Sequence, residues 1–126
     1  MVTNLTRQKL PPVGWRKIKN KILGAKYDLS LVFAGDKETA KITKKYRAKN
    51  KPANVLAFAL DKWAGEVFVD LPLVFREADG AGKTRRAYLV FLYIHALLHL
   101  KGFKHDTNKE LKIMNKAEQK WLKALS

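Results

Sequence analysis

The sequence contains no cysteine among its 126 residues. A disulfide framework and a thiolate metal site are therefore excluded, and the ligands of any soft metal have to be histidines. Acidic residues are also scarce, because 11 Asp and Glu stand against 26 Lys and Arg, which gives a formal net charge of +15 at pH 7. Such a basic chain favours a polyanionic partner such as nucleic acid or acidic lipid, although a Lys-rich surface that serves solubility alone is an alternative.

Long apolar segments are missing as well. The longest apolar run, residues 87–94, is far shorter than the roughly 20 residues that span a bilayer. Residues 1–8 lack the apolar core of a secretory signal, so we expect a cytoplasmic protein with no membrane partner and no disulfide partner. The length suits one hydrophobic core and the chain carries no linker, so we expect a single domain over residues 1–126.

Hydrophobic periodicity predicts an α+β fold in which four to five helices pack on a small mixed sheet. Helical patterns cover residues 15–23, 36–47, 84–100 and 108–125, and strand patterns cover residues 27–34, 55–60 and 65–70. Asp36 is the expected N-cap of its helix, whose apolar face would carry Ile42 and Tyr46. Pro72 and the glycine-containing residues 77–83 are expected to form a loop.

The two C-terminal helices carry the clearest signals. The middle of residues 84–100 is apolar on every side, which indicates a buried central helix that Thr84 caps and Gly102 ends. The capping box Thr107-x-x-Glu110 opens the last helix. Its apolar stripe consists of Leu111, Met114, Ala117, Trp121, Leu122 and Leu125.

All three histidines of the chain fall within residues 95–105. His95 and His99 are four residues apart on one face of the buried helix and can chelate one ion. Gly102 lets the chain leave the helix and turn back, which brings His105 to the position of a third ligand. Three unrelated histidines are the alternative, but the spacing, the helix stop and the third histidine occur together. Three imidazoles with water in the fourth position are typical of catalytic zinc.

Such a site favours hydrolysis, since a bound metal lowers the pKa of its water from about 15.7 to roughly 7 and polarises an ester oxygen. We expect one divalent metal, zinc, although three imidazoles also accept nickel, copper or cobalt. Metzincin proteases share the spacing His-x-x-x-His-x-x-Gly-x-x-His, but they place a glutamate after the first histidine as general base. This chain has Ala96 there, which cannot take a proton.

The histidine segment also resembles a known family. Residues 95–105 read His-Ala-Leu-Leu-His-Leu-Lys-Gly-Phe-Lys-His and are similar to the hallmark His-Gly-x-Leu-His-Leu-x-Gly-aromatic-Asp-His of the YbeY family of metal-dependent single-strand endoribonucleases. Residues 46–58 and 65–67 resemble two further segments of that family in the same order. Ala96, Lys104 and Asn54 depart from the family pattern, and the last two replace acids. These departures leave the histidines in place and put any supporting role of the two lost carboxylates in doubt.

The resemblance implies an enzyme that hydrolyses single-stranded RNA, with a role in maturation of ribosomal RNA at the 3′ end of the small-subunit RNA and in ribosome quality control. It also implies that Arg47 lies near the active site, where we assign it a bidentate clamp on the phosphate; a solvated cation is the alternative. The expected catalytic residues are therefore Arg47, His95, His99 and His105, the histidines also being the metal ligands. The attacking group is either water or a ribose hydroxyl.

Basic residues elsewhere are candidates for RNA contacts. We expect Lys44, Lys45, Arg85 and Arg86 to bind the backbone of single-stranded RNA. For the two arginines, the alternative is that the protein surface simply tolerates cations at the start of the helix. Glu66 and Asp70 are conceivable proton acceptors, but surface or salt-bridged carboxylates are the preferred interpretation. Two other functions stay open, a minimal metzincin-like metalloprotease and a non-enzymatic RNA-binding ribosome-assembly factor with a structural metal.

Overall fold

The computed structural model describes residues 1–47, 54–104 and 106–125, with the side chains of residues 46 and 47 left aside. Its elements, in chain order, are β1 Val2–Asn4, α1 Trp15–Leu23, β2 Asp28–Ala34, α2 Asp36–Arg47, β3 Val55–Asp61, β4 Ala64–Asp70, α3 Leu71–Gly80, α4 Arg85–Lys101 and α5 Asn108–Leu125. The helices and the small sheet confirm the predicted α+β class. The described residues contain no helix long and apolar enough to cross a membrane.

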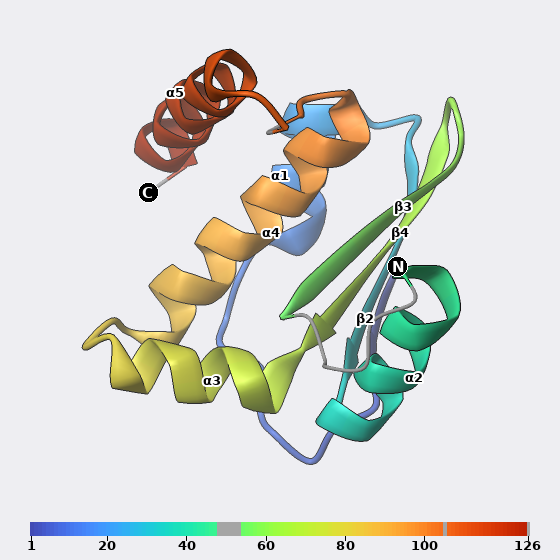
Figure 1. Ribbon diagram of the computed structural model, residues 1–126, viewed down its shortest axis with the longest axis vertical. Helices are drawn as coiled ribbons and strands as arrows, with labels where there is room; N and C mark the ends of the chain where they lie inside the picture. Colours follow the sequence, from blue (N-terminus) through green and yellow to red (C-terminus); the bar gives the residue numbers. More distant parts are fainter. Residues whose placement is uncertain (48–53, 105, 126) are drawn as a thin grey trace.

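The sheet is mixed, with strand order β1-β2-β4-β3. β1, β2 and β4 are parallel, whereas β3 runs antiparallel to β4 and forms one edge of the sheet. Helix α4 lies on one side of this sheet and α2 on the other (Figure 1). The side chains of Leu29, Leu31, Phe33, Val67 and Val69 are buried in the core that α4 completes. The predicted strand alternation of β2 is confirmed, because Leu29, Leu31 and Phe33 are buried whereas Asp28 and Ser30 are exposed.

Helix α4 is the central helix that its apolar sequence predicted. Thr84 caps it by accepting a hydrogen bond from the amide of Ala87 at 3.1 Å. The hydroxyl of Tyr93 donates to the carbonyl of Trp15 at 2.8 Å, which fixes α1 against α4 and satisfies a polar group within the core. The fully buried residues of α4 include Leu89, Tyr93, Ile94, Leu97 and Leu98.

Helix α5 returns along α4 and begins with the predicted capping box (Figure 1). The hydroxyl of Thr107 accepts from the amide of Glu110, and the carboxylate of Glu110 accepts from the amide of Thr107, both at 3.1 Å. Met114 of the expected stripe is fully buried, but Leu111 is 42% exposed. The face of α5 that packs against the core is therefore narrower than the apolar stripe predicted from the sequence.

Two local predictions were wrong. The expected loop around Pro72 is largely helix α3, in which Pro72 occupies the first turn and Asp70 caps the helix by accepting from the amide of Leu73. Proline is well tolerated there, because its missing N–H would have no helical partner in any case. Helix α2 begins at Asp36 itself rather than being capped by it, and Thr39 is buried whereas Ile42 is half-buried.

Candidate metal centre

His95 and His99 lie one turn apart on α4, and their Nε2 atoms are 3.2 Å from each other. Two nitrogens that each bind a tetrahedral zinc at about 2.0–2.1 Å are separated by roughly 3.3 Å. The same distance also suits a hydrogen bond in which the Nε2 of one imidazole carries a proton and the Nε2 of the other accepts it. The pair therefore has the spacing that one metal ion requires, and the predicted convergence of these two rings is met by the geometry.

Glu118 of α5 holds the other nitrogen of His95. Its Oε1 contacts Nδ1 of His95, and its side chain lies buried although it is a carboxylate. A carboxylate can only accept a hydrogen bond, so Nδ1 carries the proton and the lone pair of the neutral imidazole is on Nε2, next to His99. Carboxylate support of this kind orients a histidine ligand and raises its basicity. Glu118 was not among the site residues predicted from the sequence.

Both histidines open into a cavity of about 620 Å³. Helix α4 contributes the histidines and Ala96, strand β3 contributes Val55 and Ala57, and α5 contributes Glu118 on the opposite side. Because β3 is an edge strand, no further strand of the described sheet closes this side of the cavity. The paired imidazoles are thus accessible to a ligand of moderate size.

Helix α4 ends at Gly102, in a left-handed backbone conformation. Gly102 has a φ of +116°, which favours glycine, and the amides of Gly102 and Phe103 donate to the carbonyls of His99 and Leu98 at 3.1 and 3.0 Å. These two bonds form a Schellman motif, as the sequence predicted for this glycine. His105 follows on the connection to α5 but falls outside the described residues, so its role as third ligand stays a prediction. Within the described part of the chain, no group of three or more His, Cys, Asp or Glu side chains could hold a metal.

The other candidate residues are spread over several elements. Arg47 is the last residue of α2, and its side chain is not among those that the structure describes. Asn54, the next residue described, lines the histidine cavity. Lys44 and Lys45 are exposed on α2, the helix on the far side of the sheet from α4 (Figure 1). The structure does not bring these two lysines to the histidine cavity, and their RNA contacts stay predictions.

The two arginines at the start of α4 make contacts within the protein. Arg85 pairs with Asp79 at 2.8 Å, and its guanidinium lies 4.6 Å from the centre of the Phe75 ring. Arg86 donates from Nε to the carbonyl of Pro12 at 3.1 Å. Both arginines therefore have partners within the protein, and their contacts with RNA phosphates stay predictions.

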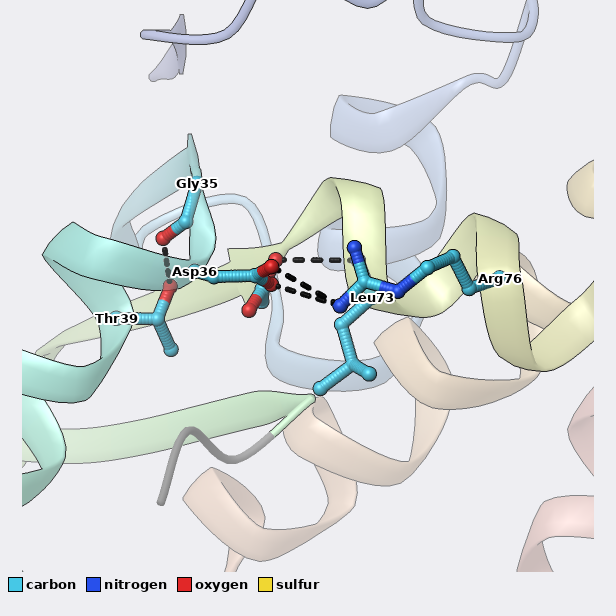
Figure 2. A network of polar contacts seen from close by, with 6 residues as sticks. Gly35, Asp36, Thr39, Leu73 and Arg76 are labelled. Carbon is cyan, nitrogen blue, oxygen red and sulfur yellow. Dashed lines mark hydrogen bonds and ion pairs between the residues drawn. The ribbon is translucent and has the colours of Figure 1, made fainter. Parts of the chain in front are cut away.

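Asp70 belongs to an acid pair away from the histidines. Arg76 of α3 donates two hydrogen bonds to the carboxylate of Asp36, at 3.1 and 3.0 Å (Figure 2). Burial and a hydrogen bond with Asp36 raise the pKa of Asp70 to about 7, while Asp70 and Arg76 lower the pKa of Asp36. Below about pH 7 the protonated form of Asp70 is therefore favoured. The Asp70 side chain caps α3, and neither it nor Glu66 lines the histidine cavity.

A buried helix that presents two converging imidazoles, one of them backed by a carboxylate, defines an α+β protein with a candidate mononuclear metal centre. The chain matches the sequence model of the family described as Endoribonuclease YbeY over residues 8–126. It therefore belongs to the YbeY family, as its histidine segment predicted. The cavity with His95 and His99 lies inside the matched region.

Individual relatives agree with this assignment. The chain is 33% identical to "Endoribonuclease YbeY" of Bartonella henselae over 108 residues, covering 79% of this chain and 68% of that protein. It is also 33% identical to the protein of the same name from Geobacter sulfurreducens over 125 residues, covering 86% and 82%. The solution structure of a Thermotoga maritima protein superposes with a TM-score of 0.68 over 99% of this chain and 89% of that chain, at 22% identity. That likeness shows a shared fold.

Proposed function

We propose that this protein is a metal-dependent endoribonuclease that hydrolyses phosphodiester bonds of single-stranded RNA. The observation that carries the proposal is the pair of Nε2 atoms, 3.2 Å apart at the wall of an accessible cavity, with Glu118 on the far nitrogen of His95. Membership of the YbeY family supports the reaction class, since its curated relatives bear the name endoribonuclease.

On this proposal His95, His99 and His105 hold one divalent metal, and zinc is the metal we expect. The residues fit a metal because the Nε2 atoms of two imidazoles lie at ligand spacing, and His105 follows in the sequence three residues after the helix stop at Gly102. When bound, such a metal supplies Lewis acidity toward the phosphodiester and a water of lowered pKa. Glu118 keeps His95 in one tautomer and one orientation while substrate enters.

Arg47 is proposed to bind the phosphate next to the metal site. A guanidinium offers paired donors that match two phosphate oxygens and offsets the charge that builds up in the transition state. Support comes from the family resemblance, which implies that Arg47 lies near the active site. Replacing Arg47 with lysine keeps the charge and removes the fork, which makes it an informative variant.

The proposed substrate is ribosomal RNA, with maturation of the 3′ end of the small-subunit RNA and ribosome quality control as the biological role. The net charge of +15 supports a polyanionic substrate, and the family resemblance supplies the ribosomal role. A ribosomal substrate would imply a cytoplasmic location. The ribosome itself is then the expected macromolecular partner.

An assay on two substrates tests the reaction class. Zinc-loaded protein is incubated with fluorescent single-stranded RNA and with casein, alongside chelator-treated protein, His99→Ala and the exposed-surface control Lys112→Ala. Cleavage of RNA that is lost with the chelator and with His99→Ala, but kept in Lys112→Ala, is expected. Cleavage of casein alone would reassign the protein as a metalloprotease, and inertness toward both substrates together with RNA binding would reassign it as an assembly factor.

A further inference from the structure

Phe91 lies one turn before His95 on α4 and separates two cavities. Its ring centre is 6.4 Å from that of the His95 imidazole. The residue lines the histidine cavity and also a second cavity of about 330 Å³, which Tyr88 and Lys83 line from the α4 side and Leu122 from α5. An aromatic ring is therefore accessible immediately beside the candidate metal centre.

The second cavity combines an aromatic surface with a cation. The Nζ atom of Lys83 lies 5.6 Å from the centre of the Tyr88 ring, and Lys83 is exposed. The Tyr88 hydroxyl donates to Oε1 of Glu77 at 3.4 Å. The side-chain amide of Asn54 donates to the same Glu77 oxygen at 3.1 Å. Asn54 lines the histidine cavity, so one hydrogen-bonded chain connects the walls of both cavities.

Phe91 is more open than the core residues around it. Leu89, Val90 and Leu92 on the same helix are buried, as are Tyr93 and Ile94, whereas Phe91 is only half-buried. Packing against the core alone does not account for a ring that borders both cavities. Proteins that bind single strands combine aromatic rings, on which bases stack, with cations that follow the phosphates. Phe91 on α4 and Lys83, which lies just before the start of that helix, provide one group of each kind along the same cavity.

We propose that Phe91 is a stacking platform for the unpaired base of a nucleotide next to the scissile phosphate, with Lys83 contacting a more distant phosphate of the same strand. The inference rests on the proposed function and specifies how the substrate is held. A stacked base requires an unpaired strand, because a base within a duplex has both faces occupied by its neighbours. Stacking also tolerates every base, since each has a π-face, so this contact selects single strands rather than a sequence.

A coupling experiment tests the stacking contact. A short single-stranded RNA with one mapped cleavage bond is prepared with an abasic residue at each nucleotide flanking that bond in turn. Its affinity is measured by fluorescence anisotropy in EDTA, where no cleavage occurs, for the wild type, Phe91→Leu and Phe91→Tyr. Base removal at one flanking position should weaken binding by the wild type and by Phe91→Tyr roughly five- to hundred-fold. The same base removal should have little effect on binding by Phe91→Leu.

Phe75→Leu provides the matched control, because Phe75 is an aromatic core residue of α3 that lines neither cavity. Its sensitivity to base removal should equal that of the wild type, and melting curves establish that each variant is folded. Equal sensitivity of the wild type and Phe91→Leu at every position would overturn the stacking contact while leaving the endoribonuclease proposal intact. Absence of both RNA binding and RNA cleavage in the wild type would overturn the proposed function and this inference together.

Discussion

Glu118 and His95 are 23 positions apart in the sequence, yet the carboxylate of one contacts the imidazole Nδ1 of the other. This contact joins α5 to the centre of α4 at a buried carboxylate. The geometry of the candidate metal centre therefore depends on the docking of α5, which also places Met114 in the core. Loss of α5 would release His95 from its single tautomer.

Removal of the Glu118 carboxylate should weaken metal binding. We expect Glu118→Ala to lower zinc affinity about 10- to 100-fold, since such supporting carboxylates commonly have effects of this size. Glu118→Gln should lose less, because its amide oxygen still accepts from Nδ1 but carries no charge. Competition with a chromophoric zinc chelator measures both affinities. Glu110→Ala, which removes a capping carboxylate of the same helix, is the control, and an unchanged affinity in Glu118→Ala would contradict the assigned role.

The acid pair predicts how stability depends on pH. Asp70 has a folded-state pKa raised to about 7, whereas an unfolded aspartate titrates at about 3.9. Between these values the folded protein holds a proton that the unfolded chain has released, so the free energy of unfolding falls as pH rises from about 4 to 7 and then levels off. The lowered pKa of Asp36 acts below this window.

Asp70→Asn should remove this loss of stability, because asparagine is uncharged at every pH and can still accept from the amide of Leu73. The melting temperature of the variant relative to wild type should rise by on the order of several degrees between pH 4 and pH 8. Thermal unfolding followed by circular dichroism measures the difference, with Asp28→Asn in β2 as the control for losing one exposed carboxylate. A difference between variant and wild type that stays constant over this range would contradict the raised pKa of Asp70.

Gly65 is required by close packing at the start of β4. A Cβ at this position would collide with the hydroxyl of Tyr27 and would lie 3.1 Å from both the Leu100 side chain and the Phe58 carbonyl. We expect Gly65→Ala to destabilise the protein by about 1–3 kcal/mol, the usual cost of overpacking. Gly80→Ala is the control, since nothing lies within 4 Å of the added carbon and alanine suits a helix better. Urea unfolding compares them, and equal stability of the two variants would exclude the packing constraint.

RNA affinity should fall steeply with salt, because phosphate contacts release counterions. For single strands, a plot of the logarithm of the binding constant against the logarithm of the salt concentration has a slope of about −0.7 per phosphate contact. If both lysines contact phosphates, Lys44→Ala combined with Lys45→Ala should reduce the magnitude of this slope by about 1.4. Fluorescence anisotropy titrations between about 50 and 200 mM salt measure the RNA affinity and therefore the slope. Lys17→Ala with Lys21→Ala on α1 is the matched double variant. A salt-independent affinity would contradict phosphate contacts between the protein and RNA.

Local sequence signals were sufficient for the elements that carry the histidines. The apolar run, the cap at Thr84 and the stop at Gly102 determine α4, and the four-residue spacing then determines that His95 and His99 converge. These are short-range properties of one helix. The capping box at Thr107 is likewise satisfied by residues three positions apart, so it could be recognised without tertiary information.

Features that depend on distant partners were missed or misjudged. Glu118 follows Met114 by four residues and precedes Trp121 by three, so a carboxylate on the apolar face of α5 was a usable signal, but its partner His95 lies on another helix. Helix α3 was hidden because Pro72 was interpreted as a breaker rather than as a first-turn residue. Strand β1 is three residues long, and its pairing with β2 leaves no local pattern.

Metal stoichiometry shows whether the three histidines form one site. Elemental analysis of the purified protein, combined with titration of zinc into metal-free wild type, His95→Ala, His99→Ala and His105→Ala, measures how many ions bind and which histidines hold them. One ion per chain in the wild type, with affinity reduced strongly by each of the three substitutions, is the expected result. Wild-type affinity in any one of these variants, or a stoichiometry near zero in the wild type at saturating zinc, would contradict a single metal centre built from His95, His99 and His105.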